Sequence, residues 1–143
     1  MSQLPIYFFV EDIVFILKEK NHIRNWIKQA IVSEGRKLKE LNFIFCSDNY
    51  LLEINKQYLN HDTLTDIVTF DNSETDSKIV GDIFISVERV IENAATFNVS
   101  VRDELHRVII HGALHLLGYT DKNKANKALM TSKEDEYLKL RGF

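Results

Sequence analysis

Apolar side chains along the chain gather in four short runs that are typical of buried strands. The runs are IYFFV at 6–10, LNFIFC at 41–46, DIVTF at 66–70 and IVGDIFIS at 79–86. Branched and aromatic residues dominate them, which favours strand over helix. Only the polar stretch DNSETDSK separates the last two runs, so we expect these two strands to form a hairpin with a long loop.

Between and after these runs, apolar residues recur every three or four positions, which predicts helices. The expected helices cover residues 21–34, about 48–58, 87–97, 101–117 and 123–140, and the last of them would pack through Ala128, Leu129, Tyr137 and Leu138. Gly35 is suited to end the first helix, while Ser47 or Asp48 and Ser100 are suited to cap the helices that follow them. The order β-α-β-α-β-β-α-α-α predicts a mixed sheet covered by helices in two or three layers.

Length and composition indicate one globular domain spanning residues 1–143. Apolar residues make up 45% of the chain and charged residues 27%, and no proline- or glycine-rich linker interrupts it. Cys46 is the only cysteine, which excludes an internal disulfide or a cysteine zinc cage and fits a reducing compartment. We expect a cytoplasmic protein with no membrane partner, because the chain shows neither a spanning apolar run nor a basic leader.

The charge is unevenly distributed along the chain. A formal net charge of −3 is unlike that of a general nucleic-acid binder, and no DNA partner is expected. Residues 18–40 nevertheless carry a local excess of basic side chains, so a phosphate-binding face that includes Lys28, Arg36 and Lys37 is one interpretation of the first helix. An ordinary solvated helix with mixed charges is the alternative.

The candidate chemistry lies in the segment HGALHLLGYTD, residues 111–121. His111 and His115 are four positions apart in an apolar helix, so both imidazoles project from one face, one turn apart. Gly118 is suited to a left-handed turn that ends the helix and lets the chain double back. Asp121 could then bring a third ligand to the same ion and leave a fourth position for water.

Two other interpretations of these residues stay open. The skeleton H-x-x-x-H-x-x-G-x-x-D is similar to the metzincin signature, but Gly112 stands where a metzincin peptidase has its general-base glutamate. The two histidines could also be hydrogen-bonded core residues, although an ion would satisfy them well in so apolar a helix. His106 is expected to be a capping or surface residue, and His22 and His61 have no partner at ligand spacing.

At HGALHLLGY the segment closely resembles the bacterial YbeY family of rRNA maturation factors. LEINKQYLNHDTLTDIVTF (52–70) and VGDIFIS (80–86) resemble two further blocks of that family, as do Met130 and Glu134 in the tail. The resemblance implies an α+β fold, with a mixed four-stranded sheet, about five helices and a central metal-binding helix in a zincin-like arrangement. It also implies a metal-dependent endoribonuclease of single-stranded RNA, acting in rRNA maturation and ribosome quality control, with rRNA precursors and the ribosome or its small-subunit proteins as partners.

Carried over by position, the resemblance implies that His111, His115 and Asp121 hold one zinc ion. Asp121 stands where the family has a third histidine, and this harder ligand could broaden the choice of ion toward nickel, manganese or iron. Leu59 stands where the family usually has an arginine, the side chain best suited to clamp a phosphate. Candidate substitutes are Lys56, Arg89, Arg102 and Lys122.

The mechanism that these residues suggest uses the ion as a Lewis acid on a phosphodiester oxygen, with a metal-bound water or the RNA 2′-hydroxyl as nucleophile. Asp66 and Asp82 are the candidate catalytic carboxylates that accept the proton, because each begins or interrupts an apolar strand; capping of strand ends is the alternative for both. Besides a hydrolase of RNA, a metzincin-like peptidase and a non-catalytic ribosome-associated module with a structural ion remain as hypotheses. Gly112 argues against the peptidase, while Leu59 keeps the non-catalytic module open.

Overall fold

The computed structural model describes residues 4–59 and 65–143, with Leu59 described by its backbone only. Its elements are β1 (Ile6–Val10), α1 (Lys20–Ser33), β2 (Lys37–Cys46), α2 (Asp48–Ile54), a π-helical turn η1 (Asn55–Leu59), β3 (Ile67–Asp71), β4 (Lys78–Ser86), α3 (Val87–Phe97), α4 (Val101–Leu116) and α5 (Lys124–Lys139). The strands form one mixed sheet in the order β1-β2-β4-β3, in which only the β3–β4 pair is antiparallel. Within the described part of the chain, the predicted α+β class with four strands and five α-helices is confirmed.

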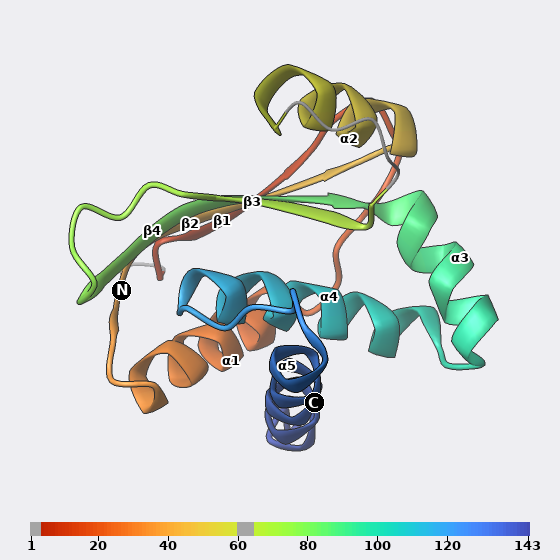
Figure 1. The fold of residues 1–143 in the computed structure, drawn as a ribbon. Coiled ribbons are helices and arrows are strands. Elements are labelled where there is room, and N and C mark those ends of the chain that lie inside the picture. The colour runs from red at the N-terminus through yellow and green to blue at the C-terminus, as the bar shows by residue number, and fades with distance from the viewer. Residues whose placement is uncertain (1–3, 60–64) are drawn as a thin grey trace.

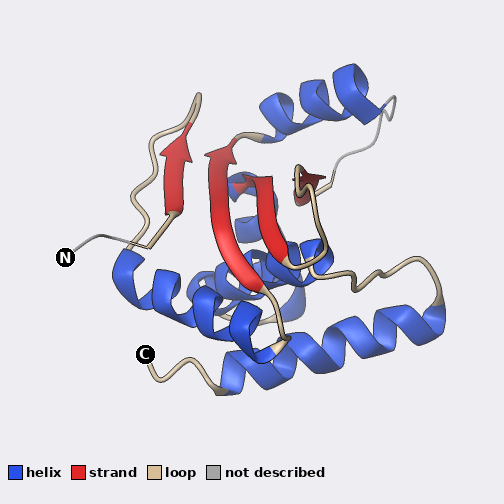
Figure 2. Cartoon of the chain, turned by 90° about the vertical axis from the view of Figure 1, so that its left-hand side faces the viewer, coloured by secondary structure: helices blue, strands red, loops and turns tan. Residues whose placement is uncertain are grey.

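Helices cover the two faces of the sheet unequally. Figure 1 shows α2 alone above the sheet, while α1, α4 and α5 lie below it and α3 leads from one end of the sheet to α4. The view at right angles in Figure 2 shows the same separation and the twist of the strands. Because side chains alternate along a strand, Ile83 and Ile85 of β4 join the large core below the sheet, whereas Phe84 packs against the smaller cluster under α2.

Helix α4 approaches the sheet closely at two glycines, one on the helix and one on β4. A Cβ on Gly112 would come within 2.9 Å of Ile67 and Ile83, and one on Gly81 would come within 2.6 Å of Leu116. Gly112 therefore faces the sheet. A glutamate at this position would be driven into the core rather than toward a metal ion, which gives a structural reason against the metzincin mechanism.

Local sequence signals correctly located most helix ends. Ser47 and Ser100 are N-caps whose hydroxyls accept hydrogen bonds from backbone N–H groups in the first turns of α2 and α4, and Gly35 follows α1 in the left-handed conformation with φ 80°. The second strand begins four residues earlier than predicted, at Lys37 rather than 41. Its exposed first half is held by pairing with the start of β4, which leaves no hydrophobic pattern to detect.

Two sequence predictions about buried side chains were wrong. Ala128 and Leu129 were expected to pack the last helix, but both are exposed, and the buried face of α5 consists of Met130, Glu134 and Tyr137. His106, expected to be a capping or surface residue, is 2% exposed and lies against Trp26 and Phe143. The buried polar side chains of Glu134 and His106 each have a hydrogen-bonding partner, which offsets the cost of their burial.

The buried His106 makes the stability of the fold depend on pH. Burial, followed by the charges of Arg141 and Arg102, lowers the pKa of His106 to about 4, and its Nδ1 accepts a hydrogen bond from Arg141 at 2.7 Å. Below a pH of about 6.5, His106 becomes protonated in the unfolded chain but stays neutral in the folded chain. Its contribution to the free energy of unfolding therefore falls by about 2 kcal/mol between pH 6.5 and 5.

We expect His106→Asn to remove this part of the pH dependence, since the amide oxygen can still accept from Arg141 but does not titrate. Urea denaturation of both proteins at about pH 7 and about pH 5 measures the difference, and other titrating groups cancel in the comparison. Equal losses of stability in the two proteins on acidification would show that His106 is not the responsible group.

Candidate metal centre and its cavity

Helix α4 and the bend after it bring the predicted ligands to one end of a cavity. His111 and His115 lie one turn apart, with ring centroids separated by 6.1 Å. The helix ends as predicted at Gly118, which has φ 106°, while the N–H of Tyr119 donates to the carbonyl of Leu114. The chain then turns back, which places Asp121 Oδ2 3.6 Å from His111 Nε2.

Glu134 of α5 orients the first histidine. Its side chain is only 8% exposed, and its Oε2 lies 2.6 Å from His111 Nδ1, while its Oε1 accepts from Arg107 at 2.8 Å. Burial lowers the pKa of His111, but the hydrogen bond to Glu134 and the charges of Glu134, Asp121 and Asp66 outweigh burial and raise it overall. With Nδ1 donating to a carboxylate, Nε2 is left to face Asp121, as in sites where a carboxylate supports a metal-binding histidine.

The donor types suit a divalent ion, although the side chains do not enclose one. Within residues 4–59 and 65–143, no three His, Cys, Asp or Glu side chains converge closely enough to surround an ion. His111 and Asp121 are paired, His115 stands one turn away, and the Asp121 side chain is 46% exposed. Two imidazoles and a solvent-accessible carboxylate are a ligand set that zinc and other first-row ions accept.

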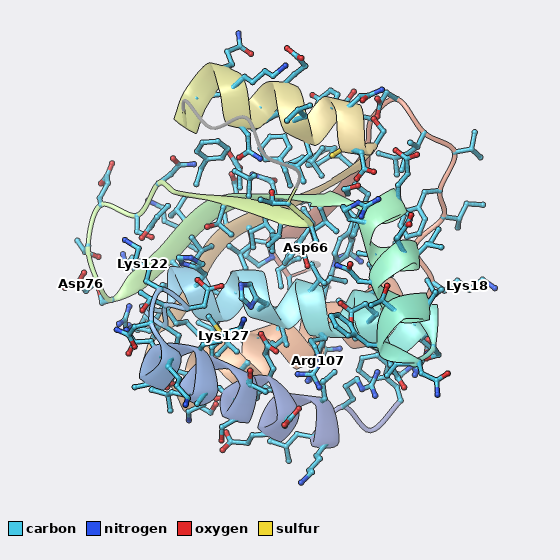
Figure 3. All side chains as sticks on the ribbon, turned by 45° about the vertical axis from the view of Figure 1, so that its right-hand side comes forward. Lys18, Asp66, Asp76, Arg107, Lys122 and Lys127 are labelled. Carbon is cyan, nitrogen blue, oxygen red and sulfur yellow. The ribbon has the colours of Figure 1, made fainter. Side chains whose placement is uncertain are left out.

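These residues line a cavity of about 790 Å³ that runs along α4 between β3 and α5. Its lining comprises Asn55, Thr65, Asp66, Ile67, Val68, Thr69, Phe97, Glu104, Arg107, Val108, His111, His115, Asp121, Lys122, Lys127, Met130, Thr131 and Glu134. Figure 3 shows Asp66, Arg107, Lys122 and Lys127 around α4 on the side of the molecule that faces the viewer.

Two further carboxyl groups in the cavity have altered proton affinity. Burial raises the pKa of Asp66, an effect that His111 partly offsets and that Glu134 and Asp121 reinforce. Burial also raises the pKa of Glu104, with a further contribution from Asp66. A carboxyl group with a raised pKa in the same cavity as two histidines is suited to exchanging protons with a bound substrate.

Comparison with known proteins assigns the chain to a family. The family model described as Endoribonuclease YbeY matches residues 12–142. The chain belongs to the endoribonuclease YbeY family. The resemblance predicted from residues 40 to the C-terminus is thus confirmed, and it extends well into the first 40 residues.

Individual YbeY relatives match over nearly the whole chain. The protein named Endoribonuclease YbeY from Cytophaga hutchinsonii is 50% identical over 143 residues, covering 100% of both chains. That from Flavobacterium psychrophilum is 56% identical over 132 residues, covering 92% of this chain and 94% of the relative. The solution structure of TM1509 from Thermotoga maritima superposes with a TM-score of 0.66 at 29% identity, covering 95% of this chain and 88% of that one.

Of the two candidate catalytic carboxylates, the fold brings only Asp66 to the cavity. Asp82 lies between Gly81 and Ile83, which both face α4, so its side chain points to the opposite face of the sheet. There it accepts hydrogen bonds from Asn42 and Asn72. Its position does not support a role in proton transfer at this site.

The cations proposed as substitutes at Leu59 have different surroundings. Arg89 pairs with Asp48 and Glu92, and Arg102 with Glu19. Lys56 lies 3.8 Å from Glu53. Only Lys122 of the four lines the cavity, and the side chain of Leu59 and all of His61 lie outside the described residues.

The basic stretch at residues 18–40 is not a continuous exposed face. Arg24 is buried, where it donates to the carbonyl of Ile6 and stacks over Phe8. Arg36 donates to the carbonyls of Asp76 and Leu117. Separately, none of the helices in the described ranges is long and apolar enough to cross a membrane.

Several cavity residues gave no chemical signal in the sequence. Glu134 appeared there only through the family resemblance, and the sequence indicated no chemical role for Glu104 or Arg107. Periodicity could have indicated Glu134, because it stands four residues after the buried Met130 and three before Tyr137. Nothing local indicates that Glu104 faces Asp66, since β3 and α4 meet only in the folded chain.

The bend that carries Asp121 is anchored from a distance by Glu34. This carboxylate accepts hydrogen bonds from the hydroxyls of Tyr119 at 2.6 Å and Tyr137 at 2.5 Å, and it pairs with Lys133. Burial raises the pKa of Glu34, but these three donors outweigh it and lower the pKa overall. The end of α1, the bend and α5 are therefore joined, which restricts where Asp121 can lie.

Proposed function

We propose that this protein is a metal-dependent endoribonuclease that cleaves single-stranded RNA in rRNA maturation and ribosome quality control. Its partners would be rRNA precursors and the ribosome or its small-subunit proteins, in the cytoplasm, where bacterial ribosomes are made. The observation that carries the proposal is the pairing of His111 with Asp121 on one side and Glu134 on the other, in the cavity of a YbeY family member. The ribosomal context is supported by family membership.

We further propose that His111, His115 and Asp121 hold one ion, zinc by preference, with nickel, manganese or iron admitted by the carboxylate. When bound, the ion would supply Lewis-acid polarisation of a phosphodiester oxygen. The three ligands and Glu134 come from α4, the bend and α5, which share one core with the sheet from Ile6 to Tyr137. That common core supports treating residues 1–143 as a single functional domain.

The chain's own residues would handle positioning and protons. Glu134 keeps His111 oriented, and Asp66 at the start of β3 accepts the proton of the attacking hydroxyl, which belongs to a water molecule or to the RNA 2′-carbon. The burial that raises the pKa of Asp66 makes its carboxylate a stronger base than an exposed one, which suits this task. Thr65 and Thr69 line the same wall and offer hydroxyls to a ribose or phosphate.

The alternatives make different predictions at the same cavity. A metzincin-like peptidase would need a base after the first histidine, a position that Gly112 occupies against the sheet. A non-catalytic ribosome-associated module would bind the ion and RNA without cleaving it. Elemental analysis of freshly purified protein would identify the resident ion for either case.

We expect Asp121→Ala to lower cleavage of single-stranded RNA by at least about 10-fold and to weaken zinc affinity, because one of three ligands is lost. The assay compares single-stranded RNA, duplex RNA, single-stranded DNA and casein, with and without chelator. Asp76→Ala is the matched control, since Asp76 is exposed on a loop and does not line the cavity.

Cleavage that survives both the chelator and the substitution would mark a contaminating nuclease. RNA binding without cleavage under any ion would favour the non-catalytic module, and digestion of casein would favour the peptidase. Selective loss of RNA cleavage in Asp121→Ala, with Asp76→Ala fully active, is the result that the endoribonuclease proposal requires.

A further inference from the structure

The charges lining the cavity pose a problem for a polyanionic substrate. Among the described residues, four carboxylates, those of Asp66, Glu104, Asp121 and Glu134, line the same space in which a phosphodiester would have to lie. One divalent ion at the histidines would offset only part of this charge. An RNA strand lying in the cavity therefore needs cations of the protein itself.

Among the residues that the structure describes, three lysine or arginine side chains line the cavity, and one of them is already engaged. Arg107 donates to Glu134 at 2.8 Å and to Asp135 at 2.7 Å, so its guanidinium is held by two carboxylates. Lys122 and Lys127 are both exposed, and neither has an ion pair or side-chain hydrogen bond within the described ranges. They are the cavity cations available to a ligand.

The two lysines stand close to the candidate metal ligands. Lys122 directly follows Asp121, and Lys127 lies in the first turns of α5, whose N-cap Asn123 accepts from the N–H of Asn126. Lys127 also donates its backbone N–H to the carbonyl of Asn123 at 2.8 Å. The positive end of the α5 dipole lies between them, which further favours an anion at this place.

We propose that Lys122 and Lys127 bind backbone phosphates of the RNA strand next to the bond that is cut. This inference rests on the proposed endoribonuclease function and deepens it by assigning the cationic wall of the cavity. Lysine is suited to the task because an ammonium group binds phosphate as a compact point charge without needing a fixed angle. Contacts to backbone phosphates bind RNA of any sequence, so other residues would have to recognise the bases.

The test compares Lys122→Ala/Lys127→Ala with the control Lys18→Ala/Lys139→Ala, which removes the same charge. Lys18 lies in the loop before α1, at the right of Figure 3, whereas Lys122 is at the left. Lys139 is the last residue of α5, at the end away from Lys127. Binding of a fluorescein-labelled single-stranded oligouridylate is followed by anisotropy over a series of salt concentrations. Binding is measured without added metal, and cleavage is measured separately with zinc.

For the cavity pair we expect roughly 10-fold weaker RNA binding and a salt dependence that is shallower by about 1.4 in log–log slope, because two phosphate contacts are lost. In the cleavage assay KM should rise by a similar factor while kcat changes little, since these contacts act equally on bound substrate and transition state. The control pair should match the native chain in both assays.

Unchanged affinity and salt slope in Lys122→Ala/Lys127→Ala would overturn the inference, even if RNA is cleaved normally. The reverse result would separate the two proposals: if the native chain binds RNA through these lysines but cuts nothing under any ion, the phosphate site stands and the endoribonuclease proposal fails. Lys122→Glu/Lys127→Glu provides a second variant, in which repulsion should weaken binding further than alanine does. Equal binding by the alanine and glutamate pairs would also contradict the inference.

Discussion

His115→Ala is expected to reduce metal-dependent RNA cleavage by at least about 100-fold while leaving the chain folded. His115 is partly exposed at the end of α4, and its ring contacts the ring of His111 at 6.1 Å between centroids. Its loss would leave one imidazole and one carboxylate, too few protein ligands for a stable zinc site. Zinc binding by calorimetry and cleavage of single-stranded RNA measure the two effects separately.

His22→Ala is the matched control for this substitution. His22 is an exposed histidine on α1 that stacks on Phe143 and stands away from the cavity. It should retain zinc affinity and cleavage. If His115→Ala bound zinc as tightly as the native chain, the ion would have to be held elsewhere and the proposed ligand set would be refuted.

Glu134→Ala is expected to destabilise the fold by about 3–5 kcal/mol and to weaken zinc binding by about 10- to 100-fold. Glu134 is the buried carboxylate between Arg107 and His111, with contacts of 2.8 and 2.6 Å. Removing it leaves the Arg107 charge with Asp135 alone and frees the His111 ring to rotate. Urea denaturation without metal measures the first effect, and zinc calorimetry measures the second.

A conservative variant separates stability from positioning. Glu134→Gln retains the side-chain volume and one hydrogen-bond acceptor, so most of the stability should return while zinc affinity remains reduced. Glu136→Ala is the surface control on the same helix, because Glu136 is 53% exposed and should change stability by less than about 0.5 kcal/mol. Native zinc affinity in Glu134→Gln would show that Glu134 supports only the fold.

Much of the secondary structure could be predicted from the sequence because its signals are local. The strands at 6–10 and 79–86 and the helices at 87–97 and 101–117 were located to within a residue or so, since each depends on periodicity or on a cap such as Ser100. The errors lie where tertiary contacts replace periodicity. Lys37–Glu40 extend β2 by pairing with β4. In α5, Glu134 lies on the buried face, whereas Ala128 and Leu129 are exposed.

The site also combines features that local sequence predicts with features that only tertiary contacts determine. The proximity of His111, His115 and Asp121 follows from helical spacing and one glycine turn, so it could be anticipated within eleven residues of sequence. Asp66 and Asp82 were both candidates by sequence, because each is an acidic residue that begins or interrupts an apolar strand. Only the alternation of β4 against α4, with Gly81 and Ile83 on the helix side, directs Asp82 away from the cavity.

The sequence by itself determined the order of elements, the family and the stretch of α4 and bend that carries the candidate ligands. These depend on interactions between residues close along the chain, whose geometry is repeated wherever the same pattern occurs. Tertiary structure alone decided that Glu134 supports His111, that Glu104 and Asp66 line the same cavity, and that Lys122 and Lys127 line it too. Such pairings join residues many positions apart, and their energies arise only when packing excludes water between them.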